Sequence, residues 1–138
     1  MPQPSRRKAR EVALQTIYSR SRFKLIAETE FLITKESKLS KKHQEFAESL
    51  ISKTWNNLDN IDQAITKNLK HWKQTRLSET LNALLRIGSC ELLYFPDTDA
   101  KIVLNESIEL CKCYVGDKAT KLCNGVLHAI WQESQEQK

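Results

Sequence analysis

The sequence is poor in the residues that interrupt helices. Only 3 Gly and 3 Pro occur among its 138 residues. This scarcity excludes collagen-like and low-complexity chains, and 40% hydrophobic with 28% charged residues fits a compact globular protein better than a disordered one. Because residues that favour helices dominate the remainder, the composition predicts an all-α fold.

Other absences narrow the function. No apolar run approaches the ~20 residues needed to span a bilayer, and the N-terminus lacks the apolar core and small-residue cleavage site of a signal peptide. A cytoplasmic protein with reduced cysteines is therefore expected. The sequence has no Gly-rich phosphate loop, and none of its three His adjoins a Ser or Cys in a recognisable motif. Nothing favours catalysis, although residues distant in sequence can still converge.

The cysteines raise the question of a zinc site. Cys111, Cys113, Cys123 and His128 lie close together in the sequence. Zinc requires ligands that converge tetrahedrally, whereas two residues at positions i and i+2 of a helix point about 200° apart. Apolar, core-like positions are also occupied by Cys90, Cys111 and Cys123. We therefore predict small buried side chains and no metal site.

The spacing of apolar residues predicts a small bundle of six or seven helices with short connections. Ser5, Ser40, Ser78 and Asp117 are expected as N-caps, and Gly116 as a left-handed C-cap. A polar break is expected at residues 56–60. The first helix is expected to start at Ser5, and a short second helix to span about residues 24–34. Further helices are expected from Ser40, over about residues 61–69, over residues 78–95 and 100–115, and from Asp117.

Positive charge is concentrated at the N-terminus. Residues 1–24 carry a charge of +6, whereas the whole chain carries +5, so the remaining 114 residues sum to −1. This distribution favours a localised polyanionic partner. On a helical wheel, Arg7 and Tyr18 fall within about 40° of each other, with Arg10 nearby. A ring beside guanidinium groups suits single-stranded nucleic acid. A merely solvated basic end is the alternative.

Polar residues inside two apolar helices also require partners. Asn105 and Glu106 lie near the start of the helix expected at residues 100–115, and Arg86 lies in an otherwise apolar segment. We interpret Asn105 and Glu106 as a structural polar pair that bonds neighbouring helix ends or Arg86. A half-buried arginine needs a carboxylate, and Glu91 and Glu106 are the candidates.

Four segments together carry a family resemblance. "RRKAREVALQTIYS", "ALLRIGSCELLY", "IVLNESIELCKCY" and "KLCNGVLHAI" resemble, in order and spacing, the signature blocks of the NusB family of transcription antitermination factors. The resemblance covers nearly the whole chain. It implies one all-helical NusB-like domain over residues 1–138, built from two packed three-helix bundles at about residues 5–75 and 76–133.

The resemblance also implies a function without catalysis, metal or cofactor. It implies binding to the single-stranded boxA element of nascent ribosomal RNA together with NusE, a small-subunit ribosomal protein. The pair would join RNA polymerase and make it resistant to termination. A protein-interaction module whose basic end serves only solubility is the alternative. Whether the chain is a monomer or a homodimer stays open.

The family pattern suggests two sets of site residues. The last helix is expected to pack beside the first, so that both ends of the chain form one continuous basic surface. Leu122 stands where the family usually has Phe, Lys118 where an acidic or polar residue is common, and Leu81 where a charged residue is frequent; these departures bear on RNA affinity and base preference. The expected RNA contacts are Arg6, Arg7, Lys8, Arg10, Tyr18, Lys118, Lys121 and Leu122. The expected NusE contacts are Leu81, Leu84, Asn105 and Glu106.

Overall fold

The computed structural model describes residues 6–23, 39–71 and 73–137, which form helices and turns with no strand. The predicted all-helical class is thereby confirmed. The N-cap expected at Ser5 and the helix expected at residues 24–34 lie outside the described residues. The described α-helices are α1 (Arg6–Phe23), α3 (Lys41–Asn56), α4 (Leu58–Lys67), α5 (Glu79–Tyr94), α6 (Ala100–Tyr114) and α7 (Thr120–Glu136), with 3-10 turns η1 (Gln74–Arg76) and η2 (Asp117–Ala119).

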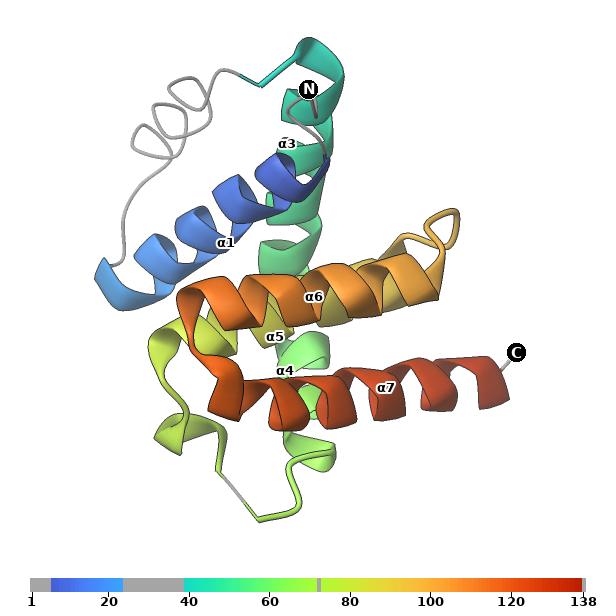
Figure 1. Cartoon of the computed structure of the whole chain (residues 1–138). Coiled ribbons are helices and arrows are strands. Elements are labelled where there is room, and N and C mark those ends of the chain that lie inside the picture. The colour runs from blue at the N-terminus through green and yellow to red at the C-terminus, as the bar shows by residue number, and fades with distance from the viewer. Residues whose placement is uncertain (1–5, 24–38, 72, 138) are drawn as a thin grey trace.

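Helix α5 is the centre of the fold. It packs against α1, α3, α4, α6 and α7, and Figure 1 shows α6 in front of it, with α7 running alongside α6. A Cβ at Gly88 would lie 3.0 Å from Leu127 Cδ1 and 3.1 Å from Ser107 Oγ, so glycine permits the close approach of both helices. Because α5 contacts helices from both halves of the chain, the division into two bundles near residue 75 stays a prediction.

Short polar side chains set several helix ends as expected. The Ser40 and Ser78 hydroxyls accept hydrogen bonds from the backbone N–H groups of His43 and Leu81, which satisfies donors that a helix start leaves unpaired. The break predicted at residues 56–60 is narrower than expected. Helix α3 ends at Asn56 and α4 begins at Leu58, so residues 59 and 60 are helical.

The approach to the last helix differs from the prediction. Asp117 is not its N-cap: Asp117 begins η2, and α7 starts at Thr120, whose hydroxyl donates to the Asp117 carbonyl oxygen at 2.7 Å. Gly116 has a positive φ of 136°, as expected for a glycine that ends a helix. Its ψ of 159° is extended, however, so its conformation is not the predicted left-handed helical one.

The position of α7 is a second correction. It packs against α4, α5 and α6, whereas α1 packs against α3 and α5. In Figure 1, α6 lies between α1 and α7. The expectation that the last helix packs beside the first is therefore wrong.

The cysteines behave as small core residues. Cys90, Cys111 and Cys123 are buried and Cys113 is exposed, and burial raises the pKa of the Cys123 thiol to about 12. Within residues 6–23, 39–71 and 73–137, no group of three or more His, Cys, Asp or Glu side chains is arranged to hold a metal ion. No helix in this part of the chain combines the length and apolarity that crossing a membrane requires.

Candidate nucleic-acid interface

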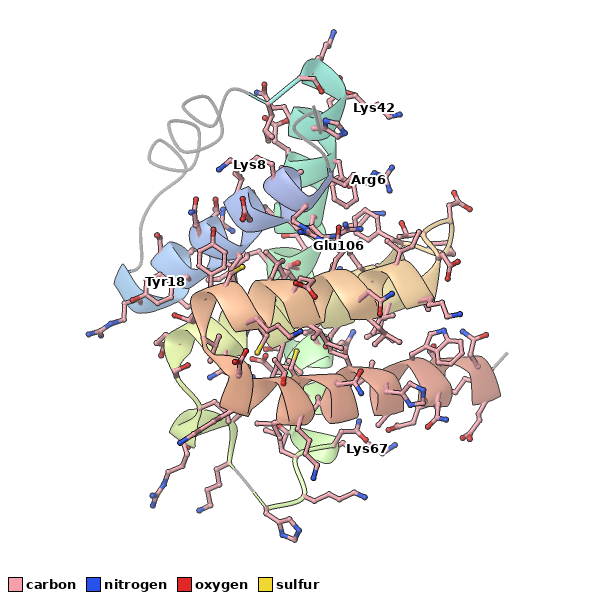
Figure 2. The ribbon with its side chains drawn as sticks, viewed as in Figure 1. Arg6, Lys8, Tyr18, Lys42, Lys67 and Glu106 are labelled. Carbon is pink, nitrogen blue, oxygen red and sulfur yellow. The ribbon has the colours of Figure 1, made fainter. Side chains whose placement is uncertain are left out.

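Burial of one side of α1 places its first turn at the surface. Ala9, Val12, Ala13 and Ile17 are buried at helical spacing, and α1 packs through this stripe on α3 and α5. Arg6, Arg7 and Lys8 precede the stripe and are exposed. Figure 2 shows Arg6 and Lys8 near the start of α1. The basic N-terminus is thus held on a packed helix from Arg6 onward.

Arg10 does not belong to this exposed set. Its side chain is nearly fully buried, and its Nε and Nη2 donate to Glu91 Oε1 at 2.6 Å and Oε2 at 2.8 Å. This two-bond contact joins α1 to α5. The expectation that Arg10 contacts a phosphate is corrected, because the guanidinium group faces the core and Glu91 already neutralises it. Removing one member of such a pair leaves an uncompensated buried charge.

Arg7 is accessible but shared with a carboxylate. Its Nε and Nη2 donate to Glu106 Oε2 at 2.9 Å and 2.6 Å, and the Arg7 side chain is half exposed. This hydrogen bond, reinforced by the negative charge of Glu106, raises the pKa of the Arg7 guanidinium above its ordinary value. Glu106, expected to contact NusE, therefore connects α6 to the cationic start of α1.

The expected partners of Arg86 were also wrong. Arg86 donates from Nε and Nη2 to the two carboxylate oxygens of Asp62, both at 2.9 Å, and from Nη1 to the Ser21 hydroxyl at 3.0 Å. Glu91 and Glu106, proposed for Arg86 from the sequence, instead pair with Arg10 and Arg7. The interpretation of Glu106 as a structural partner holds, but for a different arginine.

Arg6 rests on an aromatic ring. Its guanidinium carbon lies 4.5 Å from the centroid of the Phe46 ring of α3, and that of Arg10 lies 5.5 Å from the same ring. Within the described residues, no ion pair joins Arg6 to a carboxylate. Lys8 lies 3.5 Å from Glu11 in an exposed pair one helical turn away, which solvent weakens.

Tyr18 is not the ring beside these cations. It lies eleven residues after Arg7, which is about 16 Å along the axis, and Figure 2 shows it toward the opposite end of α1. Its side chain is partly buried against the core. A helical wheel carries no information on the distance between two residues along the helix axis. The neighbouring ring is instead Phe46 of α3, and helical spacing alone does not reveal which cation a ring contacts.

The remaining expected RNA contacts lie at the start of α7. Lys118 in η2 and Lys121 in α7 are exposed, and Leu122 is partly buried against the core. Since α7 does not pack on α1, these lysines do not form the predicted surface with the arginines through packing of the two helices.

The four residues expected to contact NusE differ in their exposure: two are buried in the core and two lie on α6. Leu81 and Leu84 are 5% and 0% exposed and belong to the core, so they present no surface to a partner, and this expectation is corrected. Both leucines lie among the buried residues of α5. Asn105 is exposed on α6, and Glu106 is partly buried against Arg7.

Comparison with known proteins agrees with this architecture. The family model described as "NusB family" matches residues 7–132. The transcription antitermination protein NusB of a Nitratiruptor species is 38% identical over 133 residues, covering 94% of this chain and 93% of the relative.

Solved structures agree as well. A chain from the crystal structure of antitermination factors NusB and NusE in complex with dsRNA superposes with a TM-score of 0.85 at 28% identity, covering 93% of this chain and 96% of that one. T. maritima NusB gives a TM-score of 0.83 at 28% identity, covering 96% and 94%. Sequence and structure together establish that the chain belongs to the NusB family.

Proposed function

We propose that this chain is a transcription antitermination factor that binds the single-stranded boxA element of nascent ribosomal RNA together with NusE and makes RNA polymerase resistant to termination. The observation that carries the proposal is its similarity, over 93% of its length, to a chain from a structure of antitermination factors NusB and NusE in complex with dsRNA. The relatives named as antitermination proteins, matched over nearly their full length, support the same role.

The start of α1 supplies the electrostatic part of the proposed RNA contact. Arg6, Arg7 and Lys8 lie within one helical turn and are exposed. Because Arg6 and Lys8 point about 200° apart, an RNA backbone that reaches all three has to pass around the start of α1. A protein that neutralises phosphates of a single strand loses affinity with salt, with a slope of about 0.7 per contact. Three contacts therefore predict a slope of about 2 in a plot of log affinity against log salt.

Lys118 and Lys121 are proposed as a second, separate basic patch. Because they lie at the start of α7, which packs away from α1, an RNA has to run across the molecule to reach both patches. Asn105 on α6 is retained as the proposed contact for NusE, since it is exposed. A homodimer remains a proposal to be tested by sedimentation of the isolated chain.

The direct test compares RNA sequences. The affinity of the full chain, with and without NusE, is measured by fluorescence anisotropy for a boxA oligonucleotide and for a scrambled one of equal length. Preference for boxA that increases with NusE supports the proposal. Equal, weak binding of both RNAs, alongside intact NusE binding, would favour a protein-interaction module whose basic end does not recognise RNA.

A further inference from the structure

A groove borders the first turn of α1 on the side away from Tyr18. It lies between the start of α1, the length of α3 from Lys42 to Lys53, and the turn that joins α5 to α6, and its cavity volume is about 420 Å³. This volume falls within the range of small-ligand sites, roughly 300–1,000 Å³. The side chains that matter for its chemistry are Arg6, Lys42, Phe46, Lys53 and Phe95.

The groove is lined by cations from two helices. Arg6 comes from α1, and Lys42 and Lys53 come from opposite ends of α3. Lys53 Nζ donates a long hydrogen bond, 3.4 Å, to the Tyr94 carbonyl oxygen at the end of α5. Two carboxylates, Glu45 and Asp97, also line the groove, so its net charge is +1, and they limit where an anionic group can lie.

Aromatic rings alternate with these cations. Phe46 and Phe95 meet edge to face, with centroids 5.7 Å apart and an interplanar angle of 68°. Arg6 lies over the Phe46 ring, and Lys53 Nζ lies 4.5 Å from the centroid of the Phe95 ring. Phe95 is only partly buried, so part of this ring faces the groove.

Cations and rings in alternation match the chemistry of a polynucleotide. A single strand presents a phosphate and a flat base in each unit, and proteins bind such bases by stacking them on aromatic rings or on arginine guanidinium planes. An acidic peptide would use the cations but has no need of the rings. The groove is also continuous with the RNA contacts proposed above, because Arg6 lines it.

We propose that this groove holds one nucleotide of the RNA, with Arg6 and Lys42 at its phosphates and the Phe95 ring at its base. The inference rests on the proposed RNA-binding function and extends the RNA path from α1 to α3 and the α5–α6 turn. Lys53 positions the Phe95 ring and adds positive charge, and Phe46 supports the Arg6 guanidinium from below.

The test uses two groove variants and a control matched in charge. Lys42→Gln should lower the salt slope of RNA binding by about 0.7. Phe95→Leu should weaken RNA binding about 5- to 150-fold with little change in slope, whereas Phe95→Tyr, which keeps the ring, should bind like the unaltered chain. Lys67→Gln removes the same charge at the opposite end of the molecule (Figure 2) and should change neither quantity.

The outcomes separate this inference from the proposed function. Thermal unfolding first verifies that each variant is folded. If the unaltered chain binds boxA RNA and the groove variants match Lys67→Gln in affinity and slope, the groove proposal is overturned while the function stands. If the unaltered chain binds no RNA with or without NusE, the proposed function itself fails. If the variants lose NusE affinity but keep RNA affinity, the groove holds a protein segment and the proposal is wrong.

A crosslinking experiment locates the base independently. RNA carrying 4-thiouridine is irradiated on the full chain, and the attached peptide is identified by mass spectrometry. Attachment within residues 94–98 is expected. Attachment confined to α1 or α7 would place the bases elsewhere and overturn the proposal.

Discussion

In the proposed RNA contact, Glu106 would compete with a phosphate for Arg7, and replacing Glu106 by Gln should strengthen RNA binding. Two hydrogen bonds, at 2.9 Å and 2.6 Å, tie Arg7 to one oxygen of this carboxylate. A phosphate that binds Arg7 has to displace or share this contact. Both groups are solvent-accessible, since the Arg7 side chain is 50% and that of Glu106 20% exposed, so the pair contributes about 0.2–1 kcal/mol, as exposed ion pairs do.

These values set the size of the expected effect. Releasing Arg7 from Glu106 should raise RNA affinity about 1.4- to 5-fold. Gln retains the size of the side chain and can still accept a hydrogen bond, so the change is mainly one of charge. The salt slope should change little, because Arg7 already counts among the three proposed phosphate contacts and the substitution only removes its competitor.

A double-mutant cycle assigns the effect to this contact. Affinity for boxA RNA is measured by anisotropy over a range of salt for the unaltered chain, Glu106→Gln, Arg7→Ala and the double variant. If Arg7 mediates the effect, Glu106→Gln should change nothing once Arg7 is replaced. An equal gain in affinity with and without Arg7 would refute the competition and indicate a general effect of removing a negative charge.

Further predictions concern stability and the second basic patch. Arg10→Ala should lower the free energy of unfolding by about 3–5 kcal/mol, measured with denaturant, because it leaves the Glu91 carboxylate buried without its partner; the salt slope of RNA binding should not change. Gly88→Ala should cost about 1–3 kcal/mol in the same assay, since its Cβ meets Leu127. Lys118→Asp should weaken binding of a long boxA RNA but not of an oligonucleotide short enough to cover α1 alone. In the native protein, a thiol reagent should label Cys113 and leave the three buried cysteines intact.

Local chemistry predicted the parts of the fold that depend on neighbours in sequence. Ser40 and Ser78 were predictable as N-caps because each hydroxyl accepts a hydrogen bond from the backbone N–H three residues later. This contact is local and does not depend on how the helices pack. The inward stripe of α1 follows from helical spacing alone. The start of α7 was mispredicted because Asp117 is a good N-cap in isolation, whereas here the chain makes a 3-10 turn first.

The pairing of arginines with carboxylates was not predictable in the same way. Arg10 and Glu91 are separated by 81 residues, and Arg7 and Glu106 by 99. A sequence shows that a half-buried arginine needs a carboxylate but not which one, because that depends on how α1 crosses α5 and α6. Phe46 illustrates the same point, because its contact with two guanidinium groups depends on the packing of α3 against α1.

The buried Arg10–Glu91 pair explains how the cationic start of α1 is tolerated and how its side chains are oriented. Cations in the first turn oppose the helix dipole, at a cost of about 0.3–1 kcal/mol each. Arg10, one turn further along than Arg6, is locked to Glu91 on the central helix α5, and the apolar stripe of α1 is buried around it. This packing fixes the rotation of α1, so that Arg6 lies over Phe46 at the edge of the groove and Arg7 faces Glu106. A bound phosphate would relieve the unfavourable charge of the first turn. Because packing in the core holds these cations at the helix start, it favours binding of a phosphate at the surface.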